Sequence, residues 1–305
     1  MKKKVVSLII MLLFLAGITT FAALRPQDPE ALCLEAVGYA QEEDYETARV
    51  LYEKAAAMGS GRAYYNLGVI YEGGFGVEQS DEKALECYSA GAEMDYPYAV
   101  YEMGSIYYQG RFGEQDFDKA LEYLHRAEDL GVVEATNDIG SLYALGTAVD
   151  QDYSMAKAYY ERAAEQGNAN ALLNLGNMYF DGKGVEKDPE MAYSYIKQAY
   201  DAGLTDAIAS MGGCYLFGYG VEQDYEKAWE LLKTAEDENG LNYGEYLGQF
   251  YRDGILVERD YEKAADYFWR EVENGSPESR EYYDALIAEG KIPADYKPKP
   301  VGPEQ

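Results

Sequence analysis

Three serines stand three residues before a lysine, a spacing at which a serine hydroxyl can be a nucleophile with the amine as its base. The pairs are Ser80 and Lys83, Ser154 and Lys157, and Ser194 and Lys197. The Ser-Asp-Asn and Lys-Thr-Gly motifs that accompany this spacing in serine acyl-transfer enzymes are absent from the sequence. Without those motifs, the three serines are better explained as ordinary helix residues than as nucleophiles.

Other reactive side chains are scarce. His125 is the single histidine, and Cys33, Cys87 and Cys214 form an odd set without close pairs. Sites built on several imidazoles are excluded, and Ser-His or Cys-His nucleophiles would have to use His125 itself. The cysteine pattern favours buried thiols over a disulfide framework. We expect no catalytic residues, no metal ligands and no cofactor.

The charge of the chain excludes several classes of partner. Its 305 residues include 55 acidic and 26 basic side chains, for a formal net charge of −29. A chain this acidic lacks the basic face that nucleic acid binding needs, and anionic membrane surfaces are disfavoured for the same reason. A content of 48% hydrophobic residues, with 32 tyrosines, also argues against disorder.

The N-terminus resembles an export signal. Three lysines precede an apolar run from Val5 to Ile18, and small residues follow at Thr20 and Ala22. This pattern predicts a secretory signal peptide over residues 1–22, with cleavage near Ala22. An uncleaved membrane anchor is the alternative. We expect a periplasmic or extracellular protein.

The remaining sequence is built from one repeat. Six glycines are each 36 residues apart: Gly68, Gly104, Gly140, Gly176, Gly212 and Gly248. A second glycine follows six residues after each of them, a tyrosine three residues after, and an alanine sixteen residues after. A fixed period of this length is typical of helical repeat proteins.

Each repeat predicts two helices. Apolar residues at spacings of three and four form one stripe in the first helix, and Gly74 and its equivalents are positioned to end it. The second helix is expected to begin after Ser80, Asp116, Asp152, Asp188, Asp224 or Asp260, which are all N-cap residues. We expect Gly68 and Ala84 to let the paired helices approach closely, with Tyr71 filling the space beside them.

One hairpin of this kind cannot bury its own apolar face, so neighbouring repeats must stack into one continuous, all-α solenoid. We expect a degenerate first repeat at 28–59, six repeats at 60–275 and a capping helix at 276–290. The Pro-rich tail, 291–305, is expected to be extended or disordered.

The repeat reads A-x-x-x-L-G-x-x-Y-x-x-G-x-G-V-x-x-D-x-x-K-A and resembles the Sel-one-like repeats, relatives of the tetratricopeptide repeat. Residues 168–203 and 206–239 match this pattern best. The resemblance implies a right-handed α/α superhelix that acts as a peptide-binding or protein-binding adaptor. Some secreted members carry a cysteine pair in each repeat, which this chain lacks. Others have been described as binding or slowly cleaving β-lactams, which leaves β-lactam binding or weak hydrolysis as the alternative function.

In such a superhelix the first helix of each pair lines the concave face. The positions left free by the buried stripe give an aromatic patch and an asparagine ladder: Tyr65, Tyr98, Tyr101, Tyr108, Asn137, Asn170, Asn177 and Phe180. Tyrosine combines apolar area with a polar tip, and a carboxamide can both donate to and accept from a bound backbone. We therefore predict an extended peptide along this face, although the same residues could be ordinary solvated or inter-repeat positions.

The charge of the expected ligand follows from the same face. Only Arg62 and Arg252 are basic there, and they lie at opposite ends of the repeat series. Peptides gripped by a terminal carboxylate are therefore disfavoured, and a basic or neutral protein or peptide fits better. Contact with a membrane is expected only if the N-terminal segment is not cleaved.

Overall fold

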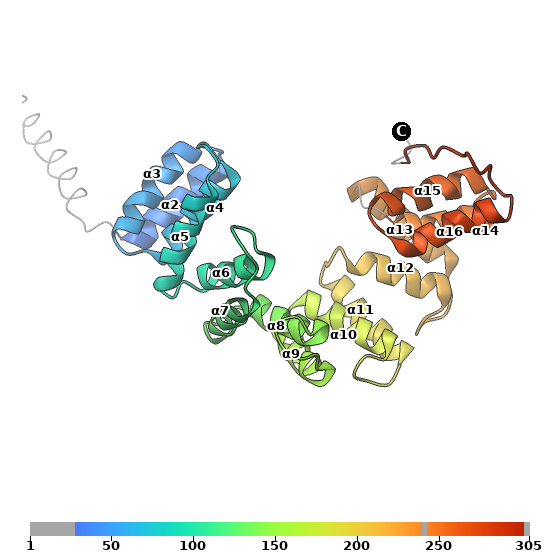
Figure 1. Cartoon of the computed structure of the whole chain (residues 1–305), viewed down its shortest axis with the longest axis horizontal. Coiled ribbons are helices and arrows are strands. Elements are labelled where there is room, and N and C mark those ends of the chain that lie inside the picture. The colour runs from blue at the N-terminus through green and yellow to red at the C-terminus, as the bar shows by residue number, and fades with distance from the viewer. Residues whose placement is uncertain (1–27, 240–242, 302–305) are drawn as a thin grey trace, which may run out of the picture. The chain divides into compact units, whose positions relative to one another are not determined.

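The computed structural model describes residues 28–239 and 243–301, and fifteen helices, α2 to α16, lie within these ranges (Figure 1). The export signal expected at residues 1–22 lies outside the described residues. The described chain forms two compact units, residues 28–135 and 136–301, with the boundary inside α8. Each unit is described separately below.

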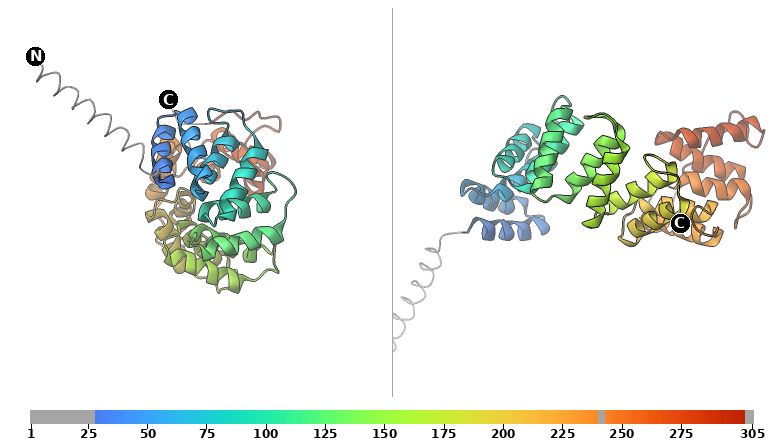
Figure 2. Two further views of the ribbon diagram at one scale, coloured as in Figure 1. Left: turned by 90° about the vertical axis from the view of Figure 1, so that its left-hand side faces the viewer. Right: turned by 90° about the horizontal axis from the view of Figure 1, so that it is seen from below.

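The helices of unit 1 are nearly equal in length. They are α2 (Pro29–Gln41), α3 (Tyr45–Ala57), α4 (Gly61–Gly73), α5 (Asp81–Glu93), α6 (Pro97–Gln109) and α7 (Phe117–Asp129). Helices α2, α4 and α6 are first helices, and each packs on the second helix that follows it (Figures 1 and 2).

Unit 2 continues the pattern. After α8 (Val133–Leu145) come α9 (Tyr153–Glu165), α10 (Ala169–Asp181), α11 (Pro189–Asp201), α12 (Ala207–Phe217), α13 (Tyr225–Asn239), α14 (Gly244–Asp253), α15 (Tyr261–Glu273) and α16 (Pro277–Ala288). The pairs α10 with α11, α12 with α13, and α14 with α15 pack together. The all-α helical repeat architecture is therefore confirmed.

The ends of the helices follow from local chemistry. Each predicted N-cap side chain accepts a backbone N–H in the first turn of its helix; Asp116, for example, accepts from Lys119 at 3.0 Å. Gly74 and its equivalents all adopt positive φ, from 65° to 75°, which closes the first helix without strain. Both predictions are confirmed.

The space beside the anchor glycine is filled differently from the prediction. A Cβ at Gly68 would lie only 2.5 Å from the Tyr88 ring, so the residue that occupies this space is Tyr88 of α5. Tyr71 is half-buried, with the Lys83 ammonium 5.2 Å from its ring centroid. In the next repeat the equivalent Tyr107 stacks on Tyr123 at 5.7 Å. These tyrosines join the two helices of a hairpin at its margin.

The C-terminal tail covers the last repeat. Tyr296 Oη and the Lys299 N–H both donate to Asp266 Oδ1, at 2.9 and 2.8 Å, and Arg270 donates to the Val301 carbonyl at 3.2 Å. Tyr296 stands 36 residues after Asp260, where another second helix would begin. Residues 291–295 form bends and a turn, residues 296–301 have no regular secondary structure, and the tail packs against α15 in place of that helix.

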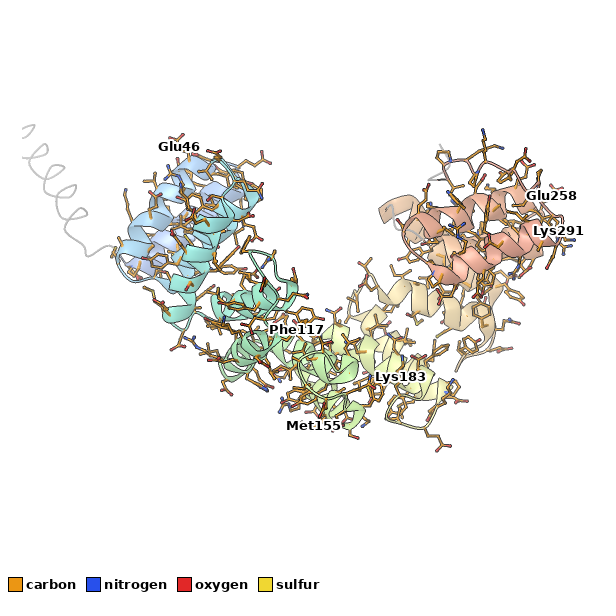
Figure 3. All side chains as sticks on the ribbon, viewed as in Figure 1. Glu46, Phe117, Met155, Lys183, Glu258 and Lys291 are labelled. Atoms are coloured by element: carbon orange, nitrogen blue, oxygen red, sulfur yellow. The ribbon has the colours of Figure 1, made fainter. Side chains whose placement is uncertain are left out.

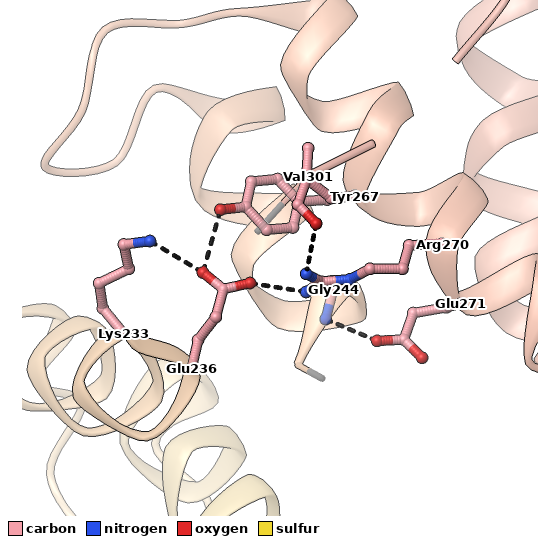
Figure 4. Close-up of polar contacts among 7 residues, drawn as sticks. All are labelled: Lys233, Glu236, Gly244, Tyr267, Arg270, Glu271 and Val301. Atoms are coloured by element: carbon pink, nitrogen blue, oxygen red, sulfur yellow. Dashed lines mark hydrogen bonds and ion pairs between the residues drawn. The ribbon is translucent and has the colours of Figure 1, made fainter. Parts of the chain in front are cut away.

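A buried ion cluster joins α13 to α15 (Figure 4). Glu236, which is 1% exposed, accepts from Lys233 at 2.8 Å, from Arg270 at 2.7 Å and from Tyr267 Oη at 3.2 Å. Because Glu236 has three donors, its charge is compensated within the fold.

Candidate binding surfaces

Three tyrosines of unit 1, the exposed Tyr98 and the half-buried Tyr65 and Tyr96, form one cluster, which we call the tyrosine surface. Tyr65 comes from α4, and Tyr96 and Tyr98 lie at the start of α6. The Tyr65 ring centroid is 5.7 Å from that of Tyr96 and 6.3 Å from that of Tyr98, and the Tyr96 and Tyr98 centroids are 6.0 Å apart. Tyr98 is 51% exposed. The surface thus offers apolar ring faces from two adjacent first helices.

A hydrogen-bonded network supports the tyrosine surface. Tyr65 packs on the ring of Tyr88 at 5.8 Å, and Tyr88 Oη donates to Glu72 Oε2 at 2.7 Å. Arg111 also donates to Glu72, at 2.7 Å, and forms an ion pair with Glu102. Burial and the bond to Glu72 raise the pKa of Tyr88, so its hydroxyl stays protonated and donates.

The sequence analysis predicted one aromatic patch containing Tyr65, Tyr98, Tyr101 and Tyr108, and only two of these tyrosines lie together. Tyr65 and Tyr98 do lie together, whereas Tyr108 packs against Phe117 (labelled in Figure 3) at 5.8 Å and Tyr101 is half-buried on α6. Tyr96 was missed because it precedes the helix and lies outside the positions read from helical periodicity. The signal available in the sequence was an aromatic residue directly before Pro97.

The predicted asparagines of unit 2 differ in whether their amides are exposed to a ligand. Asn137 is buried, and its amide is used between helices: Asn174 Nδ2 donates to Asn137 Oδ1 at 3.0 Å, and Asn137 Nδ2 donates to Asp138 at 3.1 Å. Asn137 is therefore an inter-repeat contact. Asn170 and Asn177 are exposed.

A small cavity opens beside Asn177. Its volume is about 270 Å³, and its lining includes Asn174, Tyr160, Leu145 and Lys183 (labelled in Figure 3). Asn174, which the sequence analysis did not select, connects this cavity to Asn137. The lining mixes amide, phenol and apolar groups, which suits a polar backbone segment.

Phe180 is the penultimate residue of α10 and takes part in a different surface. It is 41% exposed, and its ring meets that of Tyr219 edge to face at 5.1 Å. Tyr219 lies in the loop after α12 and was not selected from the sequence, since loop positions carry no helical period.

Ser80, Lys157 and Lys197, which belong to the three Ser-x-x-Lys pairs, are engaged in local structure. The Ser80 hydroxyl accepts the Lys83 N–H as an N-cap, Lys157 pairs with Glu161, and Lys197 pairs with Asp201. Within the described residues, no group of three or more histidine, cysteine or acidic side chains could hold a metal ion. No helix in this part of the chain is long and apolar enough to cross a bilayer.

Comparison with known proteins gives matches over most of the chain. A model of the Sel1 repeat matches residues 34–60, 61–96, 97–132, 133–168, 169–204, 205–239 and 245–268. Among solved structures, a Sel1 repeat protein from Oxalobacter formigenes is 30% identical with a TM-score of 0.70, over 77% of this chain and 96% of that one. A comparison with curated proteins gives no match.

A second solved structure is similar over a longer stretch of this chain. It is a protective antigen present in uropathogenic Escherichia coli strains, displaying an SLR fold, and it is 27% identical with a TM-score of 0.67. The match covers 90% of this chain and 60% of the antigen, so this chain spans less than two thirds of the antigen's length.

Proposed function

The chain belongs to the Sel1 repeat family, and from that premise we propose that it is an exported scaffold that binds a protein or peptide without catalysing a reaction. The tyrosine surface is the binding site in this proposal. The observation that carries it is the cluster of Tyr65, Tyr96 and Tyr98, whose rings lie within 6.3 Å of one another on adjacent first helices.

The tyrosine surface has the properties of an interface anchor. Tyrosine supplies a large contact area at a small entropic cost, and tyrosines are enriched among the residues that dominate binding energy. The bonds from Tyr88 and Arg111 to Glu72 hold the base of the cluster in place before a partner arrives. Pre-ordering of this kind lowers the entropic cost of association.

Charge defines the partner further. Arg62 pairs with Glu30 and Arg111 with Glu72 and Glu102, so these bases near the surface are already neutralised. The whole chain carries −29 charges. A basic or neutral partner is therefore attracted and a nucleic acid is repelled.

Export is part of the proposal and rests on the sequence of residues 1–22 alone. It places the scaffold in the periplasm or outside the cell, where its partner must also be. β-Lactam hydrolysis stays the alternative, but the serines at the three Ser-x-x-Lys sites offer no arrangement that favours it within the described residues.

The test is affinity capture with the full chain and with the Tyr65→Ala, Tyr98→Ala double variant. We expect the variant to fold normally and to lose a partner that the unchanged protein retains. The matched control is Met58→Ala, because Met58 is 45% exposed at the end of a second helix of the same unit. Equal capture by all three proteins would reject the tyrosine surface as the binding site.

A further inference from the structure

Unit 2 carries a second aromatic surface, the aromatic ridge, made of the exposed Phe180, Phe217 and Tyr219 and the half-buried Tyr246. Beyond the Phe180 contact, the Tyr219 ring centroid lies 5.5 Å from that of Phe217, and the Phe217 centroid lies 6.4 Å from that of Tyr246. The rings come from the ends of α10 and α12, the loop after α12, and the start of α14. Four aromatic rings are therefore contiguous across three successive repeats.

The ridge exposes more aromatic area than folding requires. Phe180, Phe217 and Tyr219 are 41%, 40% and 42% exposed, although two of them are phenylalanines. Single exposed apolar side chains are ordinary, but a contiguous aromatic set on a charged surface is typical of an interaction site. The ridge is therefore a candidate interaction site.

Gly213 gives the ridge a firm base. A Cβ at this position would lie 3.3 to 3.4 Å from the Tyr246 ring, so the glycine allows the ring to rest close against α12. The other repeats carry Val69, Ser105, Ser141, Asn177 and Gln249 at the equivalent position. The close contact between Tyr246 and α12 is thus particular to this repeat.

One acidic group without a basic partner, Glu245, lies near Tyr246 of the ridge. Glu245 precedes Tyr246 on α14, and neither it nor Glu278 of α16 forms an ion pair among the described residues. Burial raises the pKa of Glu245, and the nearby Glu278 and Glu271 raise it further. These carboxylates are close enough to repel one another, and a cation beside them would relieve the repulsion.

The nearby bases are already engaged. Lys183 pairs with Asp181 at 2.7 Å, and Arg252 pairs with Asp253 at 2.7 Å. Lys299 of the chain's own tail is directed elsewhere, since it lies against Asp266 and Glu262 on α15. A second copy of this acidic chain would add like charge. Charge complementarity therefore favours a basic segment of a different protein.

We propose that the aromatic ridge docks an extended segment of another protein in which arginine or lysine stands next to an apolar residue. The apolar side chain packs between Phe180, Phe217 and Tyr219. The cation lies over a ring face and beside Glu245, where ring and carboxylate both attract it. This inference deepens the proposed scaffold function and rests on it, but it uses unit 2 and none of the tyrosine surface.

The experiment uses the full chain and a displayed library of random short peptides as the probe. Enriched sequences should contain arginine or lysine beside an apolar residue, and one of them is then synthesised for fluorescence anisotropy. The Phe217→Ala, Tyr219→Ala variant should bind this peptide at least about tenfold more weakly, since aromatic anchors commonly dominate such interfaces. Glu245→Gln should weaken binding of the peptide and leave binding of a citrulline-for-arginine analogue unchanged.

The control variant, Tyr98→Ala, separates this inference from the proposed function. Peptides that lose affinity for Tyr98→Ala and keep it for Phe217→Ala, Tyr219→Ala would support the tyrosine surface and overturn the ridge. Failure to enrich basic sequences, or equal affinity for all variants, would also overturn the ridge. Far-UV circular dichroism verifies that the ridge variants fold, which their exposed side chains lead us to expect.

Discussion

Two glycines of unit 1 should respond in opposite ways to the same substitution. Gly68 and Gly38 both lie inside first helices, α4 and α2, where alanine is intrinsically favoured by about 1 kcal/mol. A Cβ at Gly38 would meet no described atom within 4 Å, whereas a Cβ at Gly68 would lie 2.5, 2.6 and 2.9 Å from three atoms of Tyr88. The difference is therefore one of packing alone.

The expected magnitude follows from how firmly Tyr88 is held. Its side chain is 1% exposed and bonded to Glu72, so the ring cannot move aside freely. Overpacking of this kind costs about 1–3 kcal/mol. Gly38→Ala should thus raise the free energy of unfolding by about 1 kcal/mol, whereas Gly68→Ala should lower it by up to about 2 kcal/mol after its helix gain is subtracted.

Urea denaturation followed by circular dichroism provides the assay, with the midpoints of the two variants expected on opposite sides of the unchanged protein. A second substitution tests the cause: Tyr88→Leu supplies the residue found at the equivalent Leu124. Gly68→Ala should then cost less in the Tyr88→Leu background. Midpoints that shift in the same direction for Gly38→Ala and Gly68→Ala would refute the reasoning, as would the absence of coupling to Tyr88.

Three further predictions concern unit 2. Because burial raises the pKa of Glu245, its ionised form weakens the fold, so Glu245→Gln should stabilise the protein near neutral pH. That gain in stability should vanish as pH falls through the pKa of Glu245 in the folded protein and below its pKa in the unfolded chain. Urea midpoints in neutral and acidic buffer would measure this, and a gain independent of pH would contradict the prediction. Leu256 is 50% exposed at a φ of 60°, where three other repeats have glycine, so Leu256→Gly should raise the melting temperature by relieving about 1 kcal/mol of strain. A lower melting temperature would contradict this. Glu236→Ala should lower the free energy of unfolding by about 3–5 kcal/mol, because it leaves the partly buried Arg270 without its carboxylate partner. A loss below about 1 kcal/mol in denaturation experiments would show that the ion cluster does not stabilise the fold.

The repeat period determined much of the fold in advance. Helix starts such as Asp116 and helix ends such as Gly74 depend on contacts within a few residues, so the local sequence specifies them. The contact of Gly68 with Tyr88 depends on how far one helix is offset along its partner, which periodicity leaves open. For that reason Tyr71 was assigned a place that Tyr88 occupies.

The candidate surfaces were less predictable for the same physical reason. Helical phase correctly selected exposed residues such as Tyr98 and Phe180. Helical phase could not reveal that the Asn137 amide accepts a hydrogen bond from Asn174. It also could not reveal that a loop residue, Tyr219, lies against Phe180. The tail contact to Asp266 joins residues 30 and 33 positions apart, beyond the reach of any local pattern.

Site-specific photo-crosslinking in the native host tests the central claim of a protein-binding tyrosine surface most directly. A photoreactive phenylalanine analogue would replace Tyr98 in one full-length protein and Met58, similarly exposed, in another. The account predicts a discrete protein adduct from position 98 that is absent from position 58. No adduct from either position, or the same adducts from both, would contradict it.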